Sequence, residues 1–101
     1  MYVKLTYTRR VDRVDLFFVR KALLKLPDYV VIKLQKWAID VEEYGLREIR
    51  KVHGYHDEPL KGARNGQRSI RLTRAYRAIY VELSGGEINI VMIKEVTNHE
   101  Y

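Results

Sequence analysis

Apolar residues recur along the chain with two different periods. Every second residue is apolar between Val3 and Tyr7, which is typical of a half-buried strand. The polar stretch from Arg9 to Arg13 interrupts this alternation and is expected to end the strand. Asp15 is suited to cap a helix that follows it. The apolar residues of that helix recur at helical spacing and are Leu16, Val19, Leu23 and Leu26.

A proline separates this first helix from a second one. Pro27 ends the first helix because a residue that precedes proline disfavours the helical conformation. Asp28 is suited to cap the second helix and Gly45 to close it. The apolar face of the second helix consists of Val30, Leu34, Trp37, Val41 and Tyr44. The two segments predict a helical hairpin, followed by a further helical turn or two and a loop up to Pro59.

The period returns to two after Gly66. Residues 69–72 and 76–83 alternate, and residues 87–96 form a nearly continuous β-rich run. Short connections join these three strands, so we predict an antiparallel meander. The complete order is β-α-α-β-β-β. It predicts one α+β domain over residues 1–101, with the helical hairpin packed on a mainly antiparallel four-stranded sheet.

The same alternation predicts which face of the sheet each arginine occupies. Arg71 shares a face with Ser69, while Ile70 points the other way. On the next strand, Arg77 shares a face with Ile79. The arginines of residues 68–77 therefore cannot all lie on one flat patch.

The net charge of +6 comes from one stretch of the chain. Residues 58–80 carry six cations and, after Glu58, no acidic residue. These cations are Lys61, Arg64, Arg68, Arg71, Arg74 and Arg77. Such a concentration favours an anionic partner, and a solvated basic sheet is the alternative interpretation.

Composition excludes several other classes of function. The chain has no cysteine, and His53, His56 and His99 do not have metal-ligand spacing, so we expect no metal and no cofactor. The first ten residues lack the apolar run of a signal peptide, and no window approaches the roughly 18 apolar residues of a membrane span. We therefore expect a cytoplasmic protein without a membrane partner.

Several short motifs together resemble those of the RelE/HigB/YoeB-like toxins of bacterial type II toxin–antitoxin systems. They are Glu-Pro-Leu-Lys-Gly at 58–62, Gly66, Ser-Ile-Arg-Leu at 69–72, Tyr-Arg-Ala-Ile-Tyr at 76–80 and the final His-Glu-Tyr. The resemblance implies a RelE-like fold and a ribosome-dependent mRNA endoribonuclease (an mRNA interferase) that inhibits translation. It also implies three partners, namely mRNA in the ribosomal A site, the 70S ribosome and a cognate antitoxin.

The resemblance assigns roles to individual residues of this sequence. Catalytic roles fall to Glu58, Arg71, Arg77, His99 and Tyr101, and RNA-binding roles to Lys61, Arg64, Arg68 and Arg74. The implied chemistry is metal-free: a base activates the ribose 2′-OH, which attacks the adjacent phosphate and leaves a 2′,3′-cyclic phosphate. Either Glu58 or His99 is the base. Tyr101 is either the proton donor or a platform on which a base stacks.

Two alternatives remain at this point. ParE-like relatives share the fold and inhibit DNA gyrase without catalysis, but they lack the glutamate, arginine and terminal His/Tyr set. The other alternative is a basic RNA-binding domain without activity.

Overall fold

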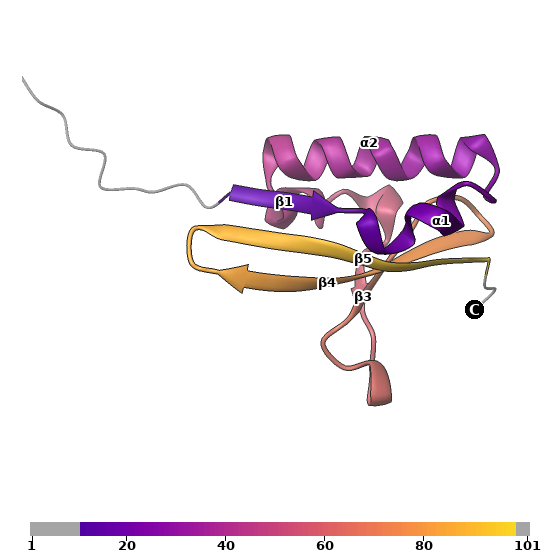
Figure 1. Cartoon of the computed structure of the whole chain (residues 1–101). Coiled ribbons are helices and arrows are strands. Elements are labelled where there is room, and N and C mark those ends of the chain that lie inside the picture. The colour runs from indigo at the N-terminus through magenta and orange to yellow at the C-terminus, as the bar shows by residue number, and fades with distance from the viewer. Residues whose placement is uncertain (1–10, 99–101) are drawn as a thin grey trace, which may run out of the picture.

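A computed structural model describes residues 11–98 as a five-stranded mixed sheet with the helices on one of its faces (Figure 1). The strand order across the sheet is β1-β5-β4-β3-β2. The strands are β1 (Val11–Asp15), β2 (Glu58–Pro59), β3 (Arg68–Arg71), β4 (Tyr76–Gly85) and β5 (Ile88–Asn98). The helices are α1 (Arg20–Leu23), α2 (Asp28–Tyr44) and α3 (Leu46–Ile49), and the 3₁₀ turns are η1 (Phe17–Val19), η2 (His53–Tyr55) and η3 (Gly62–Arg64). The predicted α+β fold is confirmed.

The first strand differs from the prediction. The strand expected at Val3–Tyr7 lies outside the described residues, and the polar stretch that was expected to end it overlaps β1 at residues 11–13. This strand forms because β5 pairs with it in parallel and because its polar groups have distant partners. Asp12 accepts hydrogen bonds from the Leu46 amide at 2.8 Å and from Asn89 Nδ2 at 2.9 Å. The sheet thus has five strands and one parallel pair instead of four mainly antiparallel strands.

The first predicted helix is much shorter than its apolar stripe suggested. Asp15 does accept a hydrogen bond from the Phe17 amide at 2.9 Å, as a capping residue would. After one turn of α1, the amides of residues 24–26 bond to carbonyls three residues earlier, so the segment tightens into turns before Pro27. The predicted hairpin therefore consists of one long helix and one short one.

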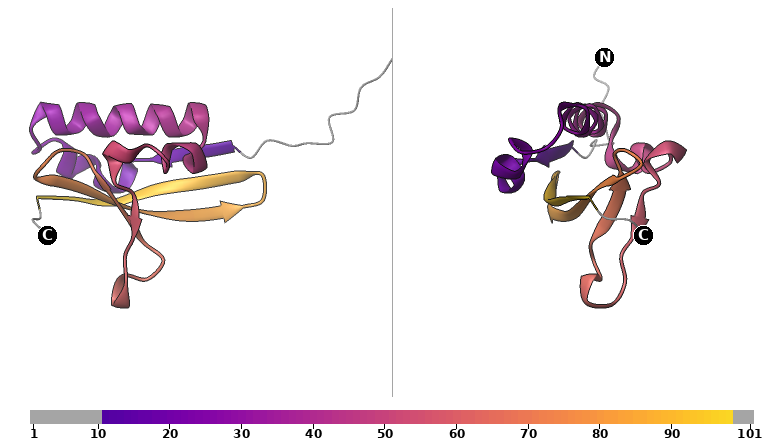
Figure 2. Two further views of the ribbon diagram at one scale, coloured as in Figure 1. Left: turned by 180° about the vertical axis from the view of Figure 1, so that it is seen from behind. Right: turned by 90° about the vertical axis from the view of Figure 1, so that its right-hand side faces the viewer.

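Helix α2 covers the middle of the sheet, as Figure 2 shows from behind and from the side. Four of its five predicted apolar positions are fully buried, and these are Val30, Leu34, Trp37 and Val41. Tyr44 is 56% exposed because it lies in the last turn, before Gly45 ends the helix. Asp28 is the first helical residue instead of the cap, which is Pro27. Its carboxylate still lies where the helix dipole favours negative charge.

The core lies between α2 and one face of the sheet. The Trp37 and Tyr80 rings meet there with their centroids 5.5 Å apart, and Ile70 and Ala78 of the meander are fully buried beside them. The three-strand meander itself is confirmed, with a register irregularity between Ile79 and Tyr80. Within residues 11–98, no helix is long and apolar enough to cross a bilayer.

Candidate functional site

The register of three strands brings four polar residues to the face of the sheet that lies away from α2. Glu58 pairs with Ser69 across β2 and β3, and Arg71 pairs with Arg77 across β3 and β4. Residues that lie directly opposite in antiparallel strands point to the same face. Because Ile70 points into the core under α2, its neighbours Ser69 and Arg71 point away from it. The predicted faces of both arginines are confirmed.

Arg77 lies at the centre of this group and is only 7% exposed. Its Nε donates a hydrogen bond to the Ser69 hydroxyl, and one terminal nitrogen donates to the His56 carbonyl at 3.2 Å. The same nitrogen is 3.7 Å from Glu58 Oε1. A guanidinium held at two points loses little freedom when it binds a further anion, which suits it to a phosphate.

Arg71 is exposed and stands opposite Arg77 on the neighbouring strand. Like charges that face each other across a sheet destabilise it. Two guanidiniums on one face therefore indicate a site for a ligand of opposite charge.

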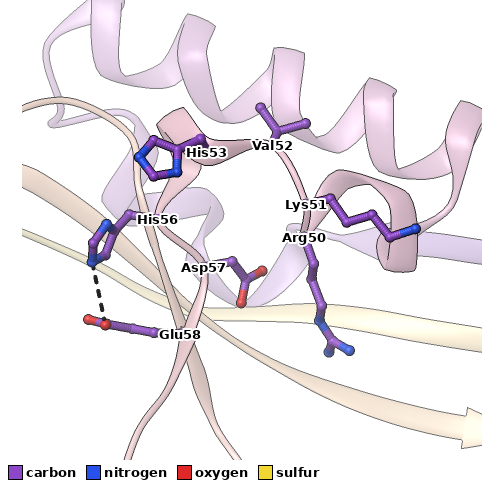
Figure 3. Close-up of a pocket in the computed structure, with 7 residues that line it drawn as sticks. All are labelled: Arg50, Lys51, Val52, His53, His56, Asp57 and Glu58. Atoms are coloured by element: carbon purple, nitrogen blue, oxygen red, sulfur yellow. Dashed lines mark ion pairs between the residues drawn. The ribbon is translucent and has the colours of Figure 1, made fainter.

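Glu58 lies between Arg77 and a histidine that the sequence analysis considered only as a metal ligand. Glu58 Oε2 is 3.6 Å from His56 Nε2, while Oε1 faces Arg77. Figure 3 shows that His56 and Glu58 project to the same side, and that Asp57 between them projects to the other. The backbone of His56 itself is left-handed, so strand alternation does not account for this arrangement, and its place two residues before Glu58 was the one sequence signal for His56.

A hollow of about 280 Å³ opens beside Glu58 (Figure 3). It is lined by Arg50, Lys51, Val52, His53, His56, Asp57 and Glu58. Two cations, two carboxylates and two imidazoles line it, so the hollow is polar and carries charges of both signs. No cluster of three or more metal-ligating side chains occurs in residues 11–98.

Asp57, between His56 and Glu58, anchors this segment on the helix side of the sheet, a role that the sequence analysis missed. Its side chain is 1% exposed and accepts hydrogen bonds from Arg68 Nε and from the Tyr80 hydroxyl, each at 2.6 Å. Tyr80 in turn accepts a hydrogen bond from Arg50 Nε at 3.1 Å, and Arg50 also pairs with Glu82. Buried networks in which each member has a partner hold a single geometry.

This network makes the stability of the fold depend on Tyr80 at alkaline pH. Burial, with the hydrogen bond to Asp57, raises the pKa of Tyr80 well above its ordinary value of 10.0. Above pH 10.0 the unfolded chain loses this proton while the folded chain keeps it, so the free energy of unfolding falls as pH rises. In the Tyr80→Phe variant we expect a shallower fall, measured by urea unfolding between pH 8 and pH 11. Equal slopes in the two proteins would contradict this role of Tyr80.

The predicted RNA-binding residues are spread over three places. Lys61 and Arg64 lie in the connection between β2 and β3, which projects beyond the sheet on the side away from α2 (Figures 1 and 2). Arg64 is paired there with Glu95 at 3.1 Å. Arg74 is exposed in the turn between β3 and β4. Arg68 points to the helix side, toward Asp57, and is therefore not brought together with Arg71 and Arg77.

The remaining two predicted catalytic residues, His99 and Tyr101, lie outside the described residues. The described part of β5 reaches the site, where Thr97 lies opposite Arg77, and its last pair is Asn98 with Tyr76. The structure thus brings Glu58, Arg71 and Arg77 to one face, and adds His56 to them.

Comparisons with known proteins found similar structures only. No family model matches the chain, and no curated protein sequence matches it significantly. Among solved structures, the RelBE2 toxin–antitoxin complex from Mycobacterium tuberculosis is similar, with a TM-score of 0.60 and 23% identity over 90% of this chain and 99% of that one. A YoeB/ParE toxin from Agrobacterium tumefaciens is similar with a TM-score of 0.59 and 17% identity, over 87% of this chain and 99% of that one. YafQ from E. coli is similar with a TM-score of 0.56 and 17% identity, over 83% of this chain and 89% of that one. The chain therefore has the fold of the RelE/YoeB/YafQ toxins.

Proposed function

We propose that this chain is the toxin of a type II toxin–antitoxin system and that it cleaves mRNA on the ribosome. The observation that carries the proposal is the placement of Glu58, Arg71 and Arg77 on one face, with Arg77 held by Ser69 and by the His56 carbonyl. These are the positions to which the sequence resemblance assigns catalysis. The similarity to structures described as RelE-, YoeB- and YafQ-type toxins supports the same conclusion.

The proposed reaction needs a proton acceptor, a phosphate-binding group and a proton donor. Glu58, or His99 from the end of the chain, removes the proton of the ribose 2′-OH. Arg71 and Arg77 stabilise the charge that develops on the phosphate oxygens, since fixed guanidiniums do this better than reorienting water. His99 or Tyr101 gives a proton to the departing 5′-oxygen. The products are a 2′,3′-cyclic phosphate and a 5′-OH, and no metal takes part.

The ribosome has a definite task in this scheme. The site is an open face of a sheet beside a hollow of about 280 Å³, and not a deep cleft that would immobilise a flexible strand. An A-site codon held by the ribosome would be presented in one geometry, which lowers the entropic barrier to in-line attack. Lys61, Arg64 and Arg74 are proposed to contact the RNA backbone around the cleaved bond.

A cognate antitoxin is the proposed second partner. The RelBE2 structure is that of a toxin–antitoxin complex, which supports a protein partner for this fold. We expect such a partner to be acidic where it covers the exposed cations Lys61, Arg71 and Arg74.

Cleavage mapping on purified bacterial ribosomes tests the proposal. We expect the wild-type protein to cut a defined message within A-site codons and to leave 2′,3′-cyclic phosphate ends, without added divalent metal beyond what the ribosome needs. Equal cutting of naked RNA would remove the ribosome from the mechanism and keep the chemistry. No cutting by folded protein, combined with inhibition of gyrase supercoiling, would replace the proposal with the ParE-like function.

A further inference from the structure

Three charged or titratable groups form a continuous row at the site. Arg77 is 3.7 Å from one carboxylate oxygen of Glu58, and the other oxygen is 3.6 Å from His56 Nε2. Arg77 is 8% exposed at its side chain and fixed, whereas the side chains of Glu58 and His56 are 52% and 56% exposed. The row therefore begins at a rigid buried cation and ends at an imidazole that a substrate can reach; Figure 3 shows its Glu58–His56 end.

Both oxygens of Glu58 face partners within the row, but one nitrogen of His56 does not. Among residues 11–98, no hydrogen bond involves His56 Nδ1, while Nε2 faces the carboxylate. A carboxylate that accepts a hydrogen bond from Nε2–H leaves Nδ1 as the proton acceptor, and it stabilises the imidazolium that forms when Nδ1 takes a proton. In structures without substrate, the distances between catalytic groups are often slightly longer than hydrogen bonds. The side chains of Glu58 and His56 are exposed enough to move from 3.6 Å to hydrogen-bond distance.

The backbone of His56 has a conformation that residues other than glycine rarely adopt. Its φ is +46°, and it is the only non-glycine residue with positive φ in the described part of the chain. This conformation persists because the His56 carbonyl accepts a hydrogen bond from Arg77, and because neighbouring Asp57 is held by Arg68 and Tyr80. Strain of this kind collects at functional sites, where it fixes a side chain in a working position.

We propose that His56 is the catalytic proton acceptor of this site and that Glu58 orients it. The inference rests on the proposed function, and it reassigns the first proton transfer within that reaction. The 2′-OH proton moves to His56 Nδ1 as the O2′–P bond forms and the P–O5′ bond breaks. The leaving O5′ takes its proton from His99 or Tyr101. After the product leaves, His56 gives its proton to solvent and the donor regains one from solvent, so the reaction balances without a co-reactant.

Chemical rescue tests this role directly. In the His56→Gly variant the backbone strain disappears and the Arg77 hydrogen bond remains, because the carbonyl that accepts it belongs to the main chain. We expect its cleavage rate on programmed ribosomes to fall by about 100-fold or more. Added imidazole should restore part of that rate in a saturable manner. The matched control is Lys21→Ala, on the exposed surface of α1 and outside the lining of the hollow, which should keep the wild-type rate with or without imidazole.

The possible results distinguish the role of His56 from the proposed nuclease function. A folded His56→Gly protein that cleaves as fast as the Lys21→Ala control overturns the inference while the nuclease function stands. A slow His56→Gly protein that imidazole does not rescue also overturns it, since His56 would then act only through structure. His56→Asn, which tolerates positive φ, should be equally slow, and a wild-type rate in it would contradict a proton-accepting role. Absence of cleavage by the wild-type protein overturns both proposals together.

Discussion

Replacing Arg77 with alanine is expected to abolish cleavage of ribosome-bound mRNA while the chain stays folded. The guanidinium is fixed by Ser69 and by the His56 carbonyl, and it lies beside Glu58 on the same face as Arg71. Removing one such pre-positioned donor typically costs about 10²–10³ in rate, and the loss of the contact that holds His56 adds to it. Single-turnover cleavage of a defined message, with thermal unfolding measured alongside, checks the prediction.

Two matched variants sharpen this experiment. Arg77→Lys keeps the charge but cannot reach Ser69 and the His56 carbonyl with one planar group, so we expect only partial recovery. Lys21→Ala removes one positive charge from the exposed surface of α1 and should cleave at the wild-type rate. A folded Arg77→Ala protein with wild-type cleavage would refute the assignment of Arg77 to the phosphate.

The second large effect is expected on stability, from Asp57→Ala. This change removes a carboxylate that is 1% exposed and leaves two donors, Arg68 Nε and the Tyr80 hydroxyl, without their acceptor. Breaking a buried charged pair is strongly destabilising, and the 27% exposure of Arg68 reduces the cost because water can solvate part of its side chain. We expect a loss of about 3 kcal/mol in the free energy of unfolding, measured from urea midpoints and slopes.

The control for Asp57 is another aspartate in an ion pair. Asp40 forms an ion pair at 3.0 Å with Lys36, which precedes it by one turn of α2. Asp40→Ala should therefore leave the urea midpoint close to that of the wild type. If both variants lose the same stability, Asp57 does not have the structural role described for it. Because Asp57 lies between His56 and Glu58, its loss should also lower cleavage in conditions where the chain remains folded.

The sequence allowed good predictions wherever one local period decided the outcome. Helix α2 follows from its apolar spacing, and the meander with opposed faces for Ile70 and Arg71 follows from alternation. The pairing of Arg71 with Arg77 could be expected from the same alternation once a short turn joined the two strands.

Distant contacts decided the features that the sequence did not reveal. The sequence at the start of β1 is polar and predicted the end of a strand. It is a strand because Asp12 accepts hydrogen bonds from Leu46 and Asn89. The two residues of β2 form a strand only because β3 lies beside them. The part played by Asp57 depends on Tyr80, which is 23 residues away, so local propensity carries no trace of it.

The position of β5 has a consequence for the way in which this protein is made. β5 lies between β1 and β4, so the first described strand finds its neighbour only when the last one is present. A growing chain can form α2 early, but the sheet that carries Arg77 stays incomplete until translation has passed residue 98. Unfinished chains would therefore lack an assembled site. If the proposed function is correct, a toxin of this topology does not become harmful to the ribosome that is still synthesising it.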